Sequence, residues 1–186
     1  MKNRYLKCSR CPAFYLLTEP RKIQIENWEY RRDKYIDRIN KVKLILLGES
    51  MPAGRYFYDL SSDYDIGGLR FTLKQEFNKS ELPDGLFLES LVRKGIILFD
   101  CALCPLHKMS NNTLRREAAT YCFLTINIEH MLSYPKITYV TIFPSHLGFK
   151  RNEIPVEILI REKCRYSFSD QAGLYELYNN LIARDK

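Results

Sequence analysis

The sequence lacks an apolar run of the roughly 18 residues that a membrane-spanning helix needs. It also lacks internal repeats, low-complexity tracts and linkers, so we expect residues 1–186 to form one domain and to act as a monomer. The first residues, MKNRYLKCSRCP, are basic but contain no apolar h-region. We therefore expect no secretory signal, no membrane partner and a cytoplasmic location.

The composition is that of a folded, basic protein. Hydrophobic residues make up 46% of the chain and aromatic residues 13%, which excludes disorder as its general state. The net charge is +7 and the sequence pI is near 9.1. Because a basic protein concentrates polyanions at its surface, nucleic acid is the first partner to consider.

Strand-like and helical segments alternate along the chain. Four segments have the composition of strands: residues 42–47, 95–100, 136–143 and 163–168. Residues 153–162 fit either a short helix or an extended run. Four others have helical spacing: residues 21–40, 69–94, 113–133 and 174–184. The first of these helices is dense in charge, and we expect its charged side chains to face solvent. This alternation predicts an α/β fold, a three-layer α/β/α sandwich with a mostly parallel central sheet.

The stretch after the first strand has the composition of a site. Gly48, Glu49 and Pro52 follow the apolar run, and three aromatic residues occupy positions 56–58. Ligands of parallel α/β sheets bind just beyond the carboxyl ends of the strands, so an acid and an aromatic cluster there predict a binding site. The alternative is a tight turn in which Glu49 caps backbone donors and the aromatic residues pack in the core.

Four of the six cysteines occur in CxxC pairs. Cys8 and Cys11 form one pair, and Cys101 and Cys104 form a second directly after the strand that ends at Asp100. Two residues between thiolates let both point at one metal ion, so these four could hold zinc. The other interpretations are a dithiol redox pair and cysteines that are simply buried.

Four features together resemble the uracil-DNA glycosylase superfamily, and most of all its iron–sulfur (family 4) branch. The sequence LILLGESMP at 44–52 resembles the branch's apolar strand followed by Gly-Glu-x-Pro-Gly. The aromatic residues at 56–58 lie near the place of the family's base-stacking Phe. The sequence ILFDCALCP at 97–105 resembles the family's strand that ends in Thr-Asn and is followed by Cys and Pro. The order of the family's four cluster ligands is matched by Cys8, Cys11, Cys104 and Cys122.

This resemblance implies a DNA glycosylase, which flips a damaged or deaminated base from single- or double-stranded DNA and hydrolyses its N-glycosidic bond. Glu49 would orient water or stabilise the oxocarbenium-like sugar, and Phe57 would stack on the base. The base pocket would also contain Gly48, Ser50 and Pro52. The resemblance further implies a 4Fe-4S cluster held by the four matching cysteines, with zinc or no metal as the alternatives.

The residue that reads the base departs from the family's pattern. The family has Asn at the end of the second strand, and this chain has Asp100. Asn offers a donor and an acceptor to O4 and N3–H of uracil, whereas an ionised Asp only accepts hydrogen bonds. Asp100 therefore predicts a base with an exocyclic amino group, unless a strongly raised pKa keeps the carboxyl protonated.

The family's His-Pro-Ser loop is also missing. Pro144, Ser145 and His146 follow the third strand and contain the same residue types in another order, which makes Ser145 a candidate for base binding and His146 for catalysis. The topological counterpart is the segment 168–170, which contains no His. These departures also admit a different class of protein, a non-catalytic nucleic-acid-binding module with the same fold.

Overall fold

The computed structural model describes residues 4–60, 69–133, 139–142 and 159–163. Its helices are the 3₁₀ helices η1 (Arg4–Arg10), η2 (Phe14–Leu16) and η3 (Leu106–Lys108), the α-helices α1 (Glu19–Ile36), α2 (Leu69–Glu76), α3 (Asp84–Lys94), α4 (Asn112–Cys122) and α5 (Ile128–Leu132), and the π-helix η4 (Phe123–Asn127). Its strands are β1 (Leu44–Ser50), β2 (Ile96–Ala102), β3 (Tyr139–Ile142) and β4 (Leu159–Lys163). Within these ranges, none of the helices combines the length and the apolarity that a bilayer crossing requires.

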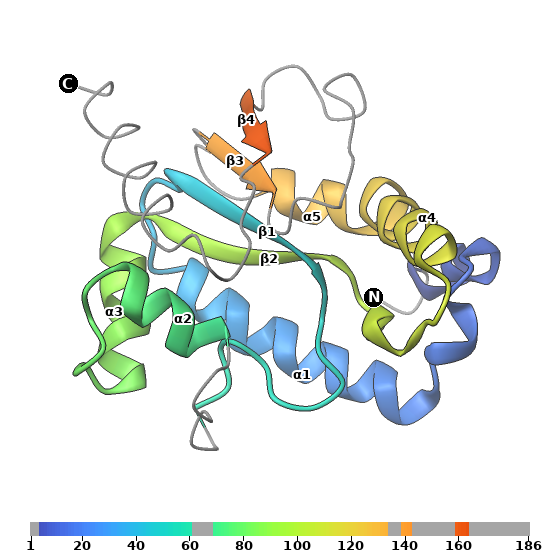
Figure 1. The fold of residues 1–186 in the computed structure, drawn as a ribbon, viewed down its shortest axis with the longest axis horizontal. Helices are drawn as coiled ribbons and strands as arrows, with labels where there is room; N and C mark the ends of the chain where they lie inside the picture. The colour runs from blue at the N-terminus through green and yellow to red at the C-terminus, as the bar shows by residue number, and fades with distance from the viewer. Residues whose placement is uncertain (1–3, 61–68, 134–138, 143–158, 164–186) are drawn as a thin grey trace.

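The four strands form a parallel sheet in the order β2-β1-β3-β4 (Figure 1). The predicted mixture of helices with a parallel sheet is confirmed at this level. β1 is longer than predicted, because Gly48 and Ser50 pair in register with Asp100 and Ala102 of β2. Glu49 therefore lies within the strand, and the prediction that the strand stops at Gly48 is wrong.

The fourth strand falls mainly in a segment that the sequence left open. β4 occupies Leu159–Lys163, in agreement with the extended alternative for residues 153–162. The predicted strand over 163–168 lies outside the described residues except for Lys163. The register of β4 places Leu159 opposite Tyr139 and Ile160 opposite Val140, so the pairing with β3 uses the apolar pair at the start of β4. The predicted closing helix at 174–184 lies outside the described residues.

The two helical segments between the strands are present as predicted, with local detail added. Residues 69–94 form α2 and α3 on either side of a turn at Pro83. Gly95 ends α3 with a φ of 69°, a conformation in which a side chain is strained. Residues 112–132 form one continuous helical run, α4–η4–α5, whose first turn is capped by the side chain of Asn111.

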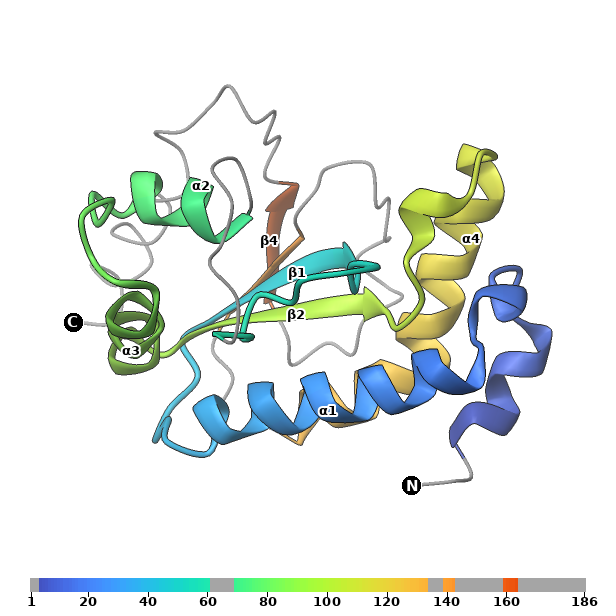
Figure 2. The ribbon, with the colours of Figure 1, turned by 90° about the horizontal axis from the view of Figure 1, so that it is seen from below.

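Helix α1 carries charged residues on its buried side, so the prediction that its charged side chains face solvent is wrong for three of them, Arg21, Glu29 and Arg32. Arg32 is 0% exposed, and Arg21 and Glu29 are also buried. The Arg32 guanidinium lies 4.7 Å from the centre of the Phe99 ring and bonds to Asp33 at 3.1 Å, so its charge is compensated on α1 itself. α1 runs along β2, with its first turn near the carboxyl ends of β1 and β2 (Figure 2).

Two side chains satisfy backbone groups of β2, whose one strand partner in the described part of the chain is β1. The Tyr58 hydroxyl accepts from the Leu98 amide at 2.8 Å and donates to the Leu98 carbonyl at 3.0 Å. The Asn127 side-chain amide donates to the carbonyls of Asp100 at 3.2 Å and Cys101 at 2.9 Å. Because buried backbone groups left unpaired are costly, these contacts stabilise β2 at the edge of the sheet.

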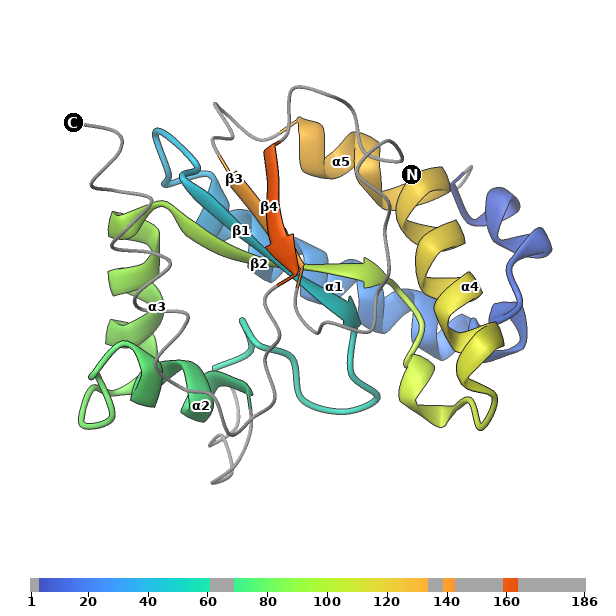
Figure 3. The same ribbon diagram turned by 45° about the horizontal axis from the view of Figure 1, so that its top comes forward.

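The N-terminal segment lies beside α4 (Figures 1 and 3). The Tyr121 hydroxyl donates to the Lys7 carbonyl at 2.7 Å, and the Cys11 thiol lies 4.0 Å from the Ala118 carbonyl. Segments more than 100 positions apart in the sequence are thus held together. This arrangement brings the first CxxC pair to the helix that contains Cys122.

Candidate functional site

Gly48 and Asp100 face each other at the carboxyl ends of β1 and β2. A Cβ atom on residue 48 would lie 2.7 Å from Asp100 Oδ1, closer than two such atoms can approach. Glycine at position 48 is therefore what allows the carboxyl group to lie against the neighbouring strand. Pairing of the β1 and β2 backbones thus brings together the two strand ends at which the sequence predicted a site.

The Asp100 carboxyl is buried and incompletely bonded. Asp100 is 6% exposed, and its Oδ2 atom has no hydrogen-bond partner in the part of the chain that the structure describes. Burial raises the pKa of this carboxyl to about 7, although Arg32 and Arg21 act to lower it. At neutral pH the group therefore exists in both protonation states, and its protonated form has a donor and an acceptor to offer.

Glu49 is bound by Arg115 of α4. Arg115 Nε donates to Glu49 Oε1 at 2.5 Å, and the adjacent guanidinium nitrogen donates to Oε2, so the pair is bidentate. Successive side chains of a strand point to opposite faces, and Gly48 is the partner of Asp100. Glu49 and Asp100 therefore share one end of the sheet but are directed to different faces.

Arg21 of α1 joins the loops that follow the two strands. Its guanidinium donates to the carbonyl of Pro52 after β1 at 2.8 Å and to that of Leu103 after β2 at 2.7 Å. It also bonds to the Met51 carbonyl at 3.4 Å. One buried cation thus fixes the spacing of the two loops, and it contributes positive potential near Asp100.

The three aromatic residues after β1 pack in the core. Tyr56 stacks on Trp28 with ring centres 5.0 Å apart, and Phe57 is 3% exposed with its ring edge-on to Tyr58. The Arg70 side chain holds this segment through the carbonyls of Phe57 and Asp59. This packing agrees with the alternative that the sequence left open for this cluster, and Phe57 presents no free ring face for stacking in this conformation.

The cysteines of the predicted cluster set lie near one another. Burial first, and then the charges of Cys11 and Cys8, raise the pKa of Cys104 to about 12. Burial also raises the pKa of Cys122, and Cys8, Cys104 and Cys11 act on it in the same direction. All four cysteines are thiols without disulfides. Segments from the N-terminus, the loop after β2 and α4 therefore converge through their cysteines.

Cys101 is influenced electrostatically both by this set and by the carboxyls at the strand ends. Burial first, and then the charges of Asp100, Cys122 and Glu49, raise its pKa. Among the described residues, no three His, Cys, Asp or Glu side chains are arranged to hold a metal ion. A single zinc ion would require its thiolates within about 4 Å of one another, since each lies about 2.3 Å from the metal.

The other predicted site residues divide into two groups. Ser50 accepts a hydrogen bond from the Leu106 amide at 3.3 Å, and Pro52 accepts one from Arg21, so both help to shape the loops at this edge. Ser145 and His146 lie outside the described residues, as does the segment 168–170. Which of the two segments, 144–146 or 168–170, is the counterpart of the His-Pro-Ser loop is therefore untested.

Three residues that complete this edge are not identified by sequence motifs: Arg21, Arg115 and Asn127. Helical periodicity could have identified Arg21. Positions 21, 25, 28 and 32 are three or four residues apart, so Arg21 lies on the same buried side of α1 as Ile25 and Trp28. Arg115 and Asn127 have no comparable signal. Their partners, Glu49 and the β2 backbone, are distant in the sequence.

Comparison with protein-family models, curated proteins and solved structures finds no match to this chain. The resemblance to the uracil-DNA glycosylase superfamily therefore stays a prediction from the sequence motifs. The chemistry of the site has to be argued from the residues at the carboxyl edge of the sheet.

Proposed function

We propose that the protein is a DNA glycosylase-like enzyme that binds a damaged or deaminated base at the carboxyl edge of β1 and β2 and hydrolyses its N-glycosidic bond. The fold in this proposal is the three-layer α/β/α sandwich of the uracil-DNA glycosylase superfamily. The observation that carries the proposal is Asp100, a buried carboxyl at the end of β2 with an oxygen that has no partner among the described residues and a pKa near 7. Such perturbed groups occur more often at functional sites than elsewhere.

Asp100 would read the Watson–Crick edge of the flipped base. In its protonated form the carboxyl donates to O4 of uracil and accepts from N3–H, as the family's Asn does. In its ionised form it accepts from an exocyclic amino group instead. A pKa near 7 therefore supports uracil recognition below neutral pH and a different base preference above it.

Glu49 would act on the sugar side of the reaction. As the C1′–N bond breaks, the base leaves with the bonding electrons and positive charge develops on the sugar. A carboxylate stabilises this charge and accepts a proton from the water whose oxygen then bonds to C1′. Arg115 would orient the Glu49 carboxylate in this role as a positioning residue. Roles for Phe57 in stacking, and for Ser145 and His146 in base binding and catalysis, stay predictions.

A 4Fe-4S cluster on Cys8, Cys11, Cys104 and Cys122 is part of the proposal. Each thiolate of such a cluster binds a different iron, so the ligands lie farther apart than around a single ion. One observation supports this choice: Cys8 and Cys11 act on the pKa of Cys104 and Cys122, so the four thiols lie in one region. The cluster would be structural, and would tie η1 and the loop after β2 to α4.

A second candidate is a nucleic-acid-binding module without catalytic activity. It is favoured by one observation, the bidentate pair that occupies both oxygens of Glu49. A carboxylate that stays bound to Arg115 in the DNA complex could not serve as a base. In that case the carboxyl edge would bind an extrahelical base and leave its glycosidic bond intact.

A base-excision assay tests the proposal. Labelled single- and double-stranded oligonucleotides carrying uracil, hypoxanthine or xanthine, with an unmodified control, are incubated with iron-replete protein and cleaved by alkali at abasic sites. We expect cleavage of at least one lesion by the wild type and none by Glu49→Gln, which should still bind the same DNA. Absence of cleavage by folded, iron-replete wild type, together with retained binding, would favour the second candidate.

A further inference from the structure

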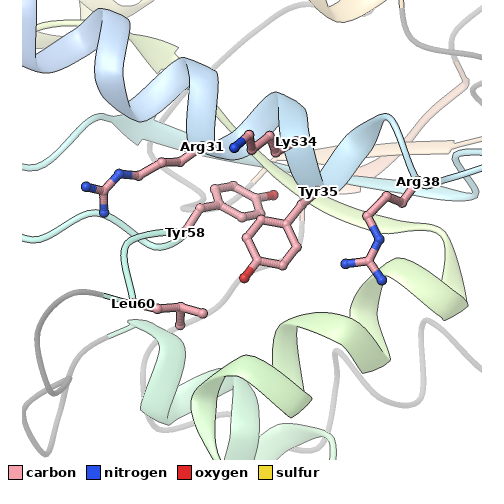
Figure 4. Close-up of a pocket in the computed structure, with 6 residues that line it drawn as sticks. All are labelled: Arg31, Lys34, Tyr35, Arg38, Tyr58 and Leu60. Carbon is pink, nitrogen blue, oxygen red and sulfur yellow. The ribbon is translucent and has the colours of Figure 1, made fainter.

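Two adjoining pockets lie along the C-terminal half of α1. The first has a volume of about 460 Å³ and is lined by Arg31, Lys34, Tyr35, Arg38, Tyr58 and Leu60 (Figure 4). The second has a volume of about 520 Å³, and its walls include Arg38, Lys41, Lys43 and Arg93. Arg38 lines both, so the two form one surface, which we call the basic path. α1 has 18 residues and is about 27 Å long, and its opposite end, at Arg21, contacts the loops beside Asp100.

Cations dominate the basic path. Six positively charged side chains line it, and Glu89 is the only carboxylate among the described residues that line either pocket. Arg38 binds both oxygens of Glu89, and Arg31 pairs with Asp59. Lys34 is exposed and lies 4.6 Å from the centre of the Tyr30 ring, a contact that leaves its charge uncompensated. Six cations and one carboxylate therefore line the described part of the path, which gives it an excess of positive charge.

An aromatic side chain lies within this charged surface. The rings of Tyr35 and Tyr58 occupy the middle of the first pocket, between Arg31 and Arg38 (Figure 4), with ring centres 5.7 Å apart. Tyr58 is buried and its hydroxyl is bound to β2, so its position is fixed. Tyr35 is half-buried and lines the pocket, so part of its surface is accessible to a ligand.

We propose that the basic path binds a single strand of nucleic acid, with its cations on successive phosphates and Tyr35 against a base. Proteins that bind single strands without sequence preference combine a positive groove with aromatic platforms for stacking, and both occur here. The inference shares a nucleic-acid ligand with the proposed function but does not depend on base excision. It adds a second contact surface, along the C-terminal half of α1.

The side chains of the basic path favour a nucleic acid over an anionic membrane. Leu60 is the one exposed large apolar side chain among the described residues that line either pocket, whereas six cations line them. A membrane-binding surface would instead present its basic residues beside an extended apolar face. Cations around a half-buried tyrosine suit a phosphodiester chain with a planar base better than an acyl layer.

Binding of a lesion-free oligonucleotide tests this inference. The affinity of fluorescein-labelled dT20 is measured at several salt concentrations for the wild type and for Lys34→Glu and Lys41→Glu, two exposed positions on the path. Lys79→Glu is the matched control, because it makes the same charge change at an exposed lysine that lines neither pocket. Thermal unfolding confirms that each variant is folded.

We expect each path variant to weaken binding about tenfold at low salt and to lower the slope of log K against log salt by about 0.7, the effect of one phosphate contact on a single strand. Lys79→Glu should change the affinity less than twofold and leave the slope unchanged. Photocrosslinking of an oligonucleotide that carries 5-iodouracil should label Tyr35. Path variants with the wild-type slope, or ones that lose affinity for phosphatidylserine vesicles but not for dT20, would overturn the inference.

The result is independent of the excision assay. If no lesion is cleaved but Lys34→Glu lowers the salt slope, the proposed function fails and the basic path stands. If a lesion is cleaved and both path variants bind dT20 with the wild-type slope, the opposite conclusion holds. Failure of both requires two separate negative results.

Discussion

The guanidinium of Arg115 binds both carboxylate oxygens of Glu49, and so joins the first turns of α4 to the end of β1. Glu49 is buried and Arg115 is half-buried. This pair therefore works in an environment where solvent screens it less than a surface ion pair. It fixes the orientation of the one carboxylate that the proposed hydrolysis requires at this strand end.

Replacement of Arg115 by Ala should destabilise the protein. The change leaves the buried Glu49 carboxylate without its bidentate donor, and we expect the free energy of unfolding to fall by about 1–3 kcal/mol. Urea denaturation followed by circular dichroism measures this loss. The exposed neighbour Arg116→Ala is the control and should cost less than about 0.5 kcal/mol. Equal effects of the two variants would show that the ion pair contributes nothing.

Replacement of Gly48 by Ala should also destabilise the protein, through Asp100. The added Cβ would lie 2.7 Å from Asp100 Oδ1, so the carboxyl group has to move. Overpacking of this kind costs about 1–3 kcal/mol. A double-mutant cycle with Asp100→Ala provides the control, because the second change removes the clashing atom. The double variant should lose less stability than the sum of the two single variants, and additive losses would contradict the contact.

Replacement of Asp100 by Asn should change the dependence of stability on pH. The folded-state pKa of Asp100, about 7, lies above the usual value of 3.8, so folding favours the protonated form. In the wild type the stabilising contribution of this group is fully present below about pH 4 and is lost as the pH rises to about 7. Asp100→Asn has no such group, so its advantage over the wild type should grow between these values and then level off, at up to about 4 kcal/mol. Denaturation midpoints between pH 4 and 8 measure it, and a constant difference would contradict burial of the carboxyl.

The sequence was sufficient to predict the parallel sheet and the positions of Glu49 and Asp100 at one edge of it. Apolar runs fix where strands form, and the direction of parallel strands fixes which ends meet. Periodicity could not reveal that β1 continues past Gly48, because that extension depends on pairing with Ala102 on another strand. The orientation of Glu49 away from Asp100 follows from the same register.

The buried charges of α1 show a second limit of sequence interpretation. Charged side chains are usually exposed, so a segment rich in Arg and Glu predicts a solvent-facing helix. Arg21 and Arg32 are buried because their partners come from elsewhere: strand-end carbonyls for Arg21 and the Phe99 ring for Arg32. Because these carbonyls and this ring are distant from α1 in the sequence, no local sequence pattern reveals them. Core packing of Phe57 was predicted from the sequence only as an alternative, because its contact with Arg70 is likewise tertiary.

Replacement of Cys11 by Ser tests the cluster. If Cys8, Cys11, Cys104 and Cys122 hold iron and sulfide, the variant should lose most of its bound iron and its visible absorbance, and should melt at a lower temperature. Cys101→Ser is the control, because Cys101 is a buried cysteine outside the proposed ligand set and its variant should keep the iron. Equal iron content in the two variants, measured after anaerobic purification, would count against the assignment.

Replacement of Tyr58 by Phe removes both hydrogen bonds to Leu98. Since the backbone amide and carbonyl of Leu98 are then left buried, we expect a loss of about 1–3 kcal/mol in the free energy of unfolding. Tyr121→Phe removes one exposed hydrogen bond, to Lys7, and should cost less. Chemical denaturation compares the two, and a smaller effect for Tyr58→Phe would show that water replaces the hydroxyl.

The side chains that bind β2 also determine how this protein can meet other copies of itself. An uncovered edge strand is a template on which a strand from another molecule can add, the first step toward aggregation or domain swapping. Tyr58 and Asn127 occupy carbonyl and amide groups that an incoming strand would need. Intermolecular sheet growth at β2 would first have to displace them. At this edge, two buried polar side chains therefore oppose strand addition, a task for which surface charges are more often used.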